Sequence, residues 1–315
     1  MLTRFFQTKR PLLLGLVSVL NLASLTLPAV EIFSAPVKRV VFLGDSITYD
    51  GHYVSDIVAY QRSREPNRQI ELINVGLSSE NTSGLSEPGH ADGKFPRPDL
   101  HERLARVLDK TKPDLVIACY GMNDGIYLPF DVARFQAFTN GMAWFHKTVE
   151  LSGAKIIHVT PPIYDGPKAG YAEVLDRFSE WLVTQQTNGW RVIDLHMPMK
   201  QALATERAKN PAFAFAKDGI HPDEQGHWLM AKTILTALGA TDLSGVTNAS
   251  GMFSDRAAGK ELLWFIHQQS VVMKDAWLTD IGHKRPQKPG LPLAEARTKA
   301  AEIEAQIQIY LHSLK

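Results

Sequence analysis

Five short, continuously apolar segments recur along the chain, and each runs into glycine, proline or polar residues. They lie at 38–44, 70–76, 114–121, 154–162 and 190–196. Strands that are covered on both faces need such unbroken apolarity, whereas a strand with one wet face alternates. The sequence therefore predicts a central, mostly parallel sheet of five strands.

Longer segments with helical periodicity separate these strands. They cover roughly 51–64, 99–110, 130–151, 171–187 and 222–238. In the last of them Trp228, Ala231 and Leu235 recur at helical spacing. Alternation of strands and helices is typical of a doubly wound domain with helices on both faces. We therefore expect a three-layer α/β/α sandwich over residues 36–240.

The pattern changes after residue 240. A loop leads to a helical segment that runs from Leu262 to about Trp277, and a second helix is expected over 293–313. These residues are too few for a core of their own. We expect 241–315 to be a helical extension that packs on the main domain.

The first 35 residues have the layout of a secretory signal peptide, with a basic lead followed by an apolar stretch over 11–30. Cleavage is expected after Ala29, because cleavage after Ala35 would leave Pro36 as the next residue, which is unfavourable. Export to the periplasm or the medium follows, with no stable membrane insertion afterwards. A retained membrane anchor is the alternative. Cys119 is the single cysteine, so no intrachain disulfide can form.

The charge balance argues against nucleic acid as a partner. The chain has 34 Lys and Arg against 33 Asp and Glu, a formal net charge of +1. Proteins that bind nucleic acid use a strong excess of basic residues to displace counterions from the phosphates. No such excess exists here.

Four sequence blocks follow strands or precede the last helix of the main domain. They are Gly-Asp-Ser-Ile at 44–47, Gly76, Gly-Met-Asn-Asp at 121–124, and Asp-Gly-Ile-His-Pro at 218–222. The carboxyl ends of parallel strands meet at one edge of a sheet, which is where such domains bind their ligands. We therefore expect these blocks to form one site.

The blocks resemble, in type and order, those of the SGNH hydrolases, also called the GDSL esterase/lipase superfamily, over residues 38–238. The resemblance implies a flavodoxin-like fold. It also implies a triad of Ser46, His221 and Asp218, and an oxyanion hole from the Ser46 N–H, the Gly76 N–H and the Asn123 side chain.

Elementary chemistry supports the triad independently. A serine hydroxyl needs a base within hydrogen-bond reach, and the base needs a carboxylate to fix its tautomer. Asp218 and His221 are three residues apart, so one loop can present both. An α/β-hydrolase would instead carry G-x-S-x-G in mid-chain and its acid well before the histidine. Gly76 lacks a side chain, so a substrate could approach its N–H closely.

Three further residues are candidate substrate contacts: Asp45, Arg97 and Asp124. Asp45 is also expected to cap the turn after the first strand. A metallophosphoesterase is the rival chemistry, because Asp45, Asn123, Asp124 and His221 are ligand types. Too few carboxylates converge to hold two ions, so we expect neither a metal nor another cofactor.

We expect the substrate to be an ester of a small acyl group, with acetyl favoured, carried on a carbohydrate. The loop at 84–98 is polar and rich in glycine, and Phe95 and Arg97 within it suit sugar hydroxyls better than a lipid tail. The family also contains lysophospholipases and thioesterases, which act on longer chains. A glycan-binding module without catalysis is the alternative from another class of protein.

Overall fold

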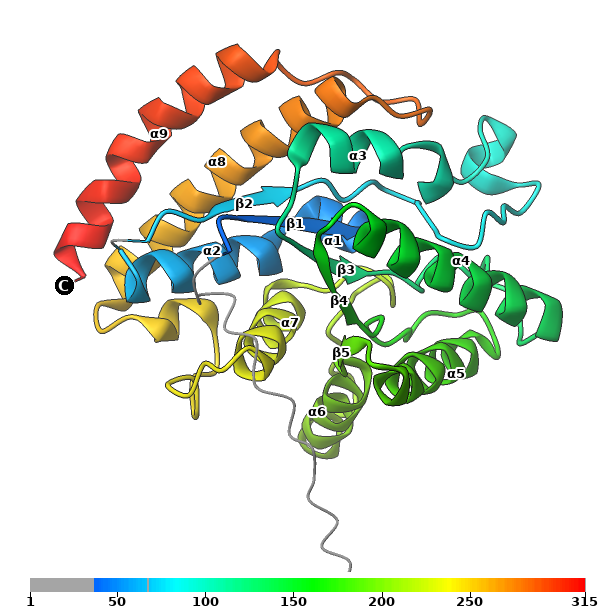
Figure 1. Cartoon of the computed structure of the whole chain (residues 1–315). Coiled ribbons are helices and arrows are strands. Elements are labelled where there is room, and N and C mark those ends of the chain that lie inside the picture. The colour runs from blue at the N-terminus through cyan, green and yellow to red at the C-terminus, as the bar shows by residue number, and fades with distance from the viewer. Residues whose placement is uncertain (1–36, 67, 315) are drawn as a thin grey trace, which may run out of the picture.

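The computed structural model describes residues 37–66 and 68–314, so the signal peptide predicted at 1–35 lies outside the described residues. Five parallel strands form the central sheet in the order β2-β1-β3-β4-β5 (Figure 1). They are β1 (Arg39–Gly44), β2 (Glu71–Asn74), β3 (Leu115–Cys119), β4 (Lys155–Val159) and β5 (Arg191–Ile193). The sheet predicted from the apolar segments is confirmed.

The middle strands lie under helices on both faces, as their unbroken apolarity requires. Val40, Val41 and Leu43 of β1 have no exposed surface, and every residue of β3 is buried. β1 and β3 pair in register, Val41 opposite Val116. Complete burial of such side chains stabilises the fold by roughly 1.5–3 kcal/mol each.

Nine α-helices surround the sheet in the described part of the chain. They are α1 (Ser46–Asp50), α2 (His52–Arg64), α3 (Leu104–Thr111), α4 (Val132–Leu151), α5 (Tyr171–Thr184), α6 (His196–Lys209), α7 (Glu224–Ala237), α8 (Arg256–Ile281) and α9 (Leu293–Ser313). Helices α2 and α7 pack together on one face. Helices α3, α4 and α5 cover the other face, as right-handed crossovers between parallel strands require.

Two helices differ from the sequence expectation. Helix α1 begins at Ser46, directly after β1, where only a turn was expected. Helix α6 follows β5, where no helix was predicted, and Pro198 lies in its first turn. Proline is tolerated there because the first N–H groups of a helix have no intrahelical acceptor.

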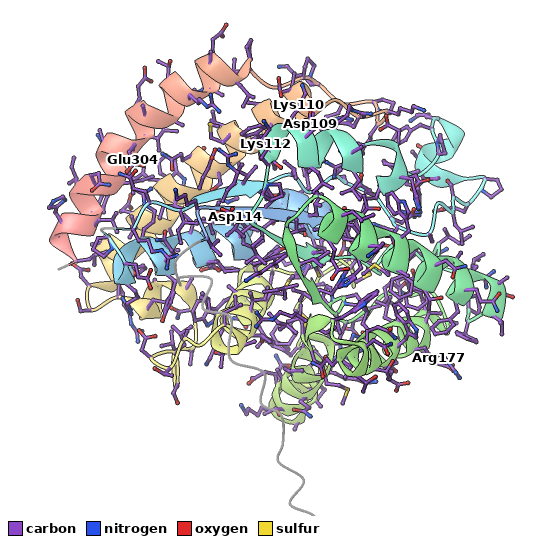
Figure 2. The ribbon with its side chains drawn as sticks, in the orientation of Figure 1. Asp109, Lys110, Lys112, Asp114, Arg177 and Glu304 are labelled. Carbon is purple, nitrogen blue, oxygen red and sulfur yellow. The ribbon has the colours of Figure 1, made fainter. Side chains whose placement is uncertain are left out.

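The last two helices pack along each other, and α8 lies between α9 and the sheet edge (Figure 1). Helix α8 contacts α2 and the edge strand β2. Arg62 of α2 pairs with Glu304 of α9 at 2.9 Å, and Lys110 of α3 pairs with Asp280 of α8 at 3.0 Å. Figure 2 labels Glu304 and Lys110 on their helices. The C-terminal helices therefore adjoin the main sheet, while the boundary at residue 240 stays a prediction.

None of the helices in the described residues combines the length and the apolarity that a membrane span requires.

Candidate active site

Ser46 lies at the carboxyl edge of the sheet, where β1 passes directly into α1. The Asp45 side chain accepts the Ile47 N–H at 2.9 Å and so caps this helix. A Cβ on Gly44 would lie 2.1 Å from Thr48 Oγ1 and 2.7 Å from the Cys119 carbonyl oxygen. Only glycine therefore allows the strand to turn this tightly and to present Ser46 at its end.

The Ser46, His221 and Asp218 side chains form a continuous hydrogen-bonded chain. Ser46 Oγ lies 2.8 Å from His221 Nε2, and His221 Nδ1 lies 2.6 Å from Asp218 Oδ2. An ionised carboxylate only accepts, so Nδ1 carries the proton and Nε2 accepts the serine hydroxyl. This is the arrangement in which a histidine can remove a proton from serine.

The loop that carries Asp218 and His221 holds itself in place. Asp218 Oδ1 accepts the N–H groups of Ile220 and His221 at 2.9 and 2.8 Å. Gly219 has φ +75°, and its carbonyl accepts the Asp165 N–H at 2.9 Å. A Cβ on Gly219 would lie 2.3 Å from Gly166, so the loop needs glycine there.

The acid of this loop is partly exposed and ionised. Burial alone would raise the pKa of Asp218, but the hydrogen bonds from the His221 ring and from the N–H groups of His221 and Ile220 outweigh it and lower the pKa. The His221 and Asp218 side chains are 49% and 52% exposed. The triad therefore opens directly to solvent.

Asn123 is buried, and both ends of its amide are engaged. Its Nδ2 donates to the Glu80 carbonyl oxygen at 3.2 Å. Its Oδ1 accepts from Arg97 Nη1 at 2.8 Å and from the Tyr127 hydroxyl at 3.1 Å. One Nδ2–H remains for another acceptor.

The structure corrects the expectation for Gly76. Its N–H donates to Asn74 Oδ1 at 2.9 Å, within the buried end of β2. A Cβ on Gly76 would lie 2.5 Å from the Tyr49 nitrogen and 2.6 Å from the Thr48 carbonyl carbon. Glycine is therefore needed because helix α1 packs against this backbone, and its N–H is not available to a substrate.

A different N–H in the same segment is unengaged. Ser79 has φ 67°, and its N–H donates no hydrogen bond within the described residues. It lies between Leu77, whose N–H donates to the Gly44 carbonyl at 2.9 Å, and Glu80, whose carbonyl accepts Asn123. Ser79 thus lies between the end of β1 and the Asn123 amide, a position that the sequence did not reveal.

Two of the predicted substrate contacts are buried, which corrects their assignment. Asp45 is 3% exposed and Asp124 has no exposed surface. Asp124 Oδ1 accepts the Thr82 N–H and hydroxyl and the Ser83 N–H, at 2.8 to 2.9 Å. Asp124 therefore fixes the loop after β2, and Asp45 serves as the expected cap.

Arg97, the third predicted substrate contact, also points inward. Its side chain is 6% exposed and makes two hydrogen bonds to Glu87, at 2.7 and 2.6 Å, besides the one to Asn123. The guanidinium lies 5.1 Å from the centre of the Tyr127 ring. Arg97 is therefore committed to protein contacts, and its buried side chain leaves little surface for the sugar contact expected from the sequence.

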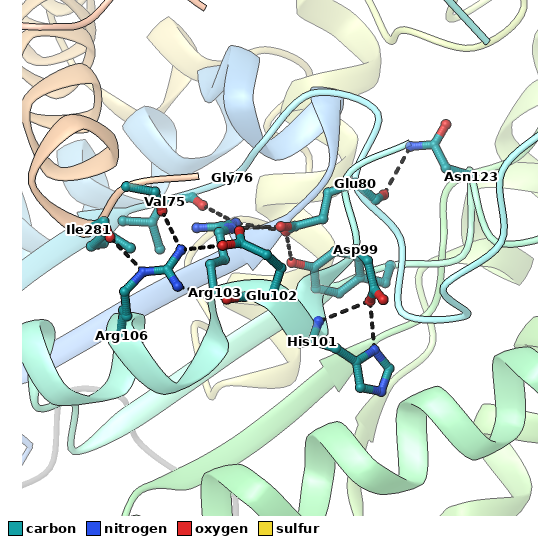
Figure 3. A network of polar contacts seen from close by, with 12 residues as sticks. Val75, Gly76, Glu80, Asp99, His101, Glu102, Arg103, Arg106, Asn123 and Ile281 are labelled. Atoms are coloured by element: carbon teal, nitrogen blue, oxygen red, sulfur yellow. Dashed lines mark hydrogen bonds and ion pairs between the residues drawn. The ribbon is translucent and has the colours of Figure 1, made fainter. Parts of the chain in front are cut away.

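Glu80, whose carbonyl oxygen accepts the Asn123 amide, is itself held by a fully buried ion pair with Arg103 (Figure 3). Arg103 Nε and Nη2 donate to the two carboxylate oxygens of Glu80 at 2.6 and 2.7 Å, and Tyr120 adds its hydroxyl at 2.6 Å. Burial alone would lower the pKa of Arg103, but the Glu80 carboxylate outweighs it and raises the pKa. Sequence reasoning missed this pair, because an arginine in an amphipathic helix resembles a solvated surface residue.

Within the described residues, no group of three or more His, Cys, Asp or Glu side chains is placed to hold a metal ion. The ligand types named from the sequence are used otherwise: Asp45 and Asp124 bind backbone N–H groups, and His221 binds Ser46 and Asp218.

A comparison with known families identifies this chain by its sequence. The sequence model of the GDSL-like Lipase/Acylhydrolase family matches residues 42–229, which is more than half of the chain and contains Ser46, Asn123, Asp218 and His221. Curated proteins include no match to this chain.

Solved structures share the fold. A gut microbial diltiazem-metabolizing enzyme, BT4096, is 26% identical with a TM-score of 0.52, over 64% of this chain and 47% of that one, so the chain spans about half its length. Axe2, an acetylxylan esterase from Geobacillus stearothermophilus, is 22% identical with a TM-score of 0.53, over 67% and 97% of the two chains. LAE5, an alpha/beta hydrolase enzyme from the metagenome of Lake Arreo, Spain, is 22% identical with a TM-score of 0.51, over 66% and 98%.

Proposed function

Because the chain belongs to the GDSL-like lipase/acylhydrolase family, we propose that it is a serine esterase in which Ser46 is the nucleophile, His221 the general base and Asp218 the orienting acid. The observation that carries this proposal is the hydrogen-bonded chain from Ser46 Oγ through the His221 ring to Asp218, with links of 2.8 and 2.6 Å. A serine without such a base is a weak nucleophile at neutral pH.

Hydrolysis proceeds in two halves. His221 Nε2 takes the proton of Ser46 Oγ as the oxygen attacks the ester carbonyl, and Asp218 stabilises the imidazolium that forms. Collapse of the tetrahedral intermediate breaks the bond to the alcohol oxygen, which leaves with the proton from His221. Water, deprotonated by His221, then attacks the acyl-enzyme and releases the carboxylic acid and free Ser46.

The negative oxygen of each tetrahedral intermediate needs preorganised donors. We assign this role to the Ser46 N–H, the remaining Nδ2–H of Asn123 and, in place of Gly76, the Ser79 N–H. The Ser46 N–H starts helix α1 and has no intrahelical acceptor. Loss of one such donor typically costs about 3 kcal/mol of transition-state stabilisation.

The proposed substrate is an ester of a small acyl group, acetyl above all, on a carbohydrate. The half-exposed His221 and Asp218 side chains support it, because an open triad admits an ester on a bulky chain. A cavity of about 690 Å³ within the described residues is lined from α2, β2, α8 and α9, and no triad residue lines it.

The test is an acyl-chain series of p-nitrophenyl esters together with acetate release from acetylated xylan and pectin. We expect acetate esters to be cleaved fastest and both glycans to release acetate, and Ser46→Ala to abolish both reactions while the protein stays folded. Preference for long-chain esters would favour the lysophospholipase or thioesterase alternative. Glycan binding without turnover in either protein would favour a binding module.

Export through cleavage of an N-terminal signal peptide is part of this proposal, since polymeric carbohydrate esters lie outside the cell. The mass of the mature protein, recovered from the periplasm or medium after expression of the full chain, tests it. Cleavage near Ala29 is the expected result. Recovery of the intact chain in the membrane fraction would favour a retained anchor.

A further inference from the structure

The Asn123 amide can help an oxyanion only in one of its two orientations. The nitrogen donates hydrogen bonds, whereas the oxygen only accepts and would repel a negative oxygen. Rotation by half a turn about the last side-chain bond exchanges the two. Some neighbouring group must therefore decide which end faces the reacting carbonyl.

Two donors engage the amide oxygen. Arg97 Nη1 lies 2.8 Å from Asn123 Oδ1, and the Tyr127 hydroxyl lies 3.1 Å from the same oxygen. A guanidinium cannot accept a hydrogen bond, so a rotated amide would set its NH₂ against a cation. The rotated state would also lose the bond from Nδ2 to the Glu80 carbonyl.

Arg97 is held rigidly for this contact. Glu87 binds it through two hydrogen bonds of 2.7 and 2.6 Å, the strong fork-to-carboxylate geometry. The backbone N–H of Arg97 donates to Ser86 Oγ at 2.9 Å. Partial burial would raise the pKa of Glu87, but the bonds from Arg97 outweigh it and lower the pKa, so the pair stays ionised at neutral pH.

Tyr127 is held in a backbone conformation that non-glycine residues rarely adopt. Ile126 has φ 49° and Tyr127 has φ 57°. The Tyr127 ring stacks on Tyr171 at 4.8 Å between centroids, and the Tyr171 hydroxyl donates to the Met122 carbonyl at 2.8 Å. Residues other than glycine are strained in this left-handed region, and they persist there where the surroundings hold them in place.

We propose that Arg97 and Tyr127 are positioning residues that set the orientation of the Asn123 amide, so that its free N–H faces the oxyanion. This inference rests on the proposed function of Asn123. It assigns to the polar loop at 84–98 a part in transition-state stabilisation through Arg97, rather than contact with a sugar.

A double-mutant cycle on kcat tests the inference. Tyr127→Phe removes one hydroxyl, and we expect kcat to fall about 3- to 10-fold with KM unchanged, the range for one neutral hydrogen bond. Arg97→Met removes a charged donor, and a fall of about 10- to 100-fold is expected. In an Asn123→Ala background, itself slower by about 100-fold or more, neither change should lower kcat further.

Tyr164→Phe is the matched control. The Tyr164 ring lies 5.9 Å from that of Tyr127, and its hydroxyl accepts the Lys168 N–H rather than contacting Asn123. We expect wild-type kcat from this variant. Thermal unfolding of each variant separates a lost fold from a lost rate, and Tyr127→Phe keeps every charged partner in place.

Two results would overturn the inference. One is a wild-type kcat in Tyr127→Phe, and the other is a loss in Tyr127→Phe that persists undiminished when Asn123 is alanine. Either result leaves the proposed function standing if hydrolysis still depends on Ser46. If the wild-type protein shows no Ser46-dependent hydrolysis, the proposed function itself fails, and this inference with it.

Discussion

The two sides of the candidate site are built differently. On one side, Asp218 and His221 lie three residues apart in a half-exposed loop, and Asp218 is fixed by N–H groups of that same loop. On the other side, Asn123 is buried and is fixed by residue 127 of its own loop and by residues 80 and 97 of the connection between β2 and α3. The acid–base side is local, and the oxyanion side depends on tertiary structure.

This difference separates rate from stability. Replacement of a side chain in the local loop removes chemistry but leaves little buried charge behind. Replacement of Arg103 on the other side leaves the fully buried Glu80 carboxylate without its counter-ion, which destabilises the whole fold. The following variants test whether the two sides separate in this way.

The largest effect on rate is expected from His221→Ala. The variant removes the group that takes the Ser46 proton, and we expect kcat to fall by about 10⁴-fold or more. The free energy of unfolding should change by less than about 1 kcal/mol, because the side chain is 49% exposed. Ester hydrolysis and urea unfolding of the same preparation measure both, and a large loss of stability would break the comparison.

Asp218→Asn should act on the same side with a somewhat smaller effect. Asparagine can present its NH₂ to His221 and stabilise the wrong tautomer, and it cannot stabilise the imidazolium. We expect kcat to fall about 10³- to 10⁴-fold. Asp165→Asn is the control, since Asp165 pairs with Arg207 and touches no triad side chain. Equal losses in the two variants would contradict the role given to Asp218.

Arg103→Met should act mainly on stability. The change leaves the fully buried Glu80 carboxylate without its cation, and we expect the protein to lose about 3–5 kcal/mol of unfolding free energy. Arg177→Met is the control, because Arg177 pairs with Glu173 on the surface and is labelled at the outside of Figure 2. That change should cost no more than about 1 kcal/mol. A similar small cost for Arg103→Met would remove the distinction between the two sides.

The smallest expected effect is a pH dependence from Asp45. Burial raises the pKa of Asp45 to about 7, and the nearby Asp124 charge contributes to the rise. The hydrogen bond from the Ile47 N–H lowers the pKa but does not outweigh burial. The folded state therefore holds a proton that the unfolded state releases near pH 3.8. Stability from this group is present below that pH and is lost as pH rises through about 7.

Asp45→Asn should remove this slope. Between pH 5 and pH 8 the wild-type protein should lose about 2–3 kcal/mol more unfolding free energy than the variant. Denaturant unfolding of both proteins across that pH range measures the difference between their unfolding free energies. Titrating groups that the two proteins share contribute equally to both curves and cancel in this difference. Parallel curves for the two proteins would show that Asp45 is ionised in the fold throughout.

The sequence predicted the local side well and the tertiary side poorly, for a physical reason. Unbroken apolarity predicts buried parallel strands, and the spacing of Asp218 and His221 already places both on one loop. Gly76 was misread because a glycine next to a strand can serve a substrate or a helix equally well. Only the packing of α1 against its backbone decides.

The inward turn of Arg97 could not be predicted for a similar reason. An arginine in a polar loop is usually solvated, and its partners Glu87 and Asn123 are 10 and 26 residues away along the chain. The same holds for the buried pair of Glu80 and Arg103, 23 residues apart. Such contacts follow from the completed fold rather than from local pattern.

The central claim is that Ser46 is a nucleophile activated by the loop that carries His221. Reaction with a fluorophosphonate, followed by intact mass and peptide mapping, tests it most directly. We expect one adduct per chain, on Ser46, that forms in the wild-type protein, slows greatly in His221→Ala and is absent in Ser46→Ala. Hydrolysis of esters by a wild-type protein that forms no adduct at Ser46 would contradict the account.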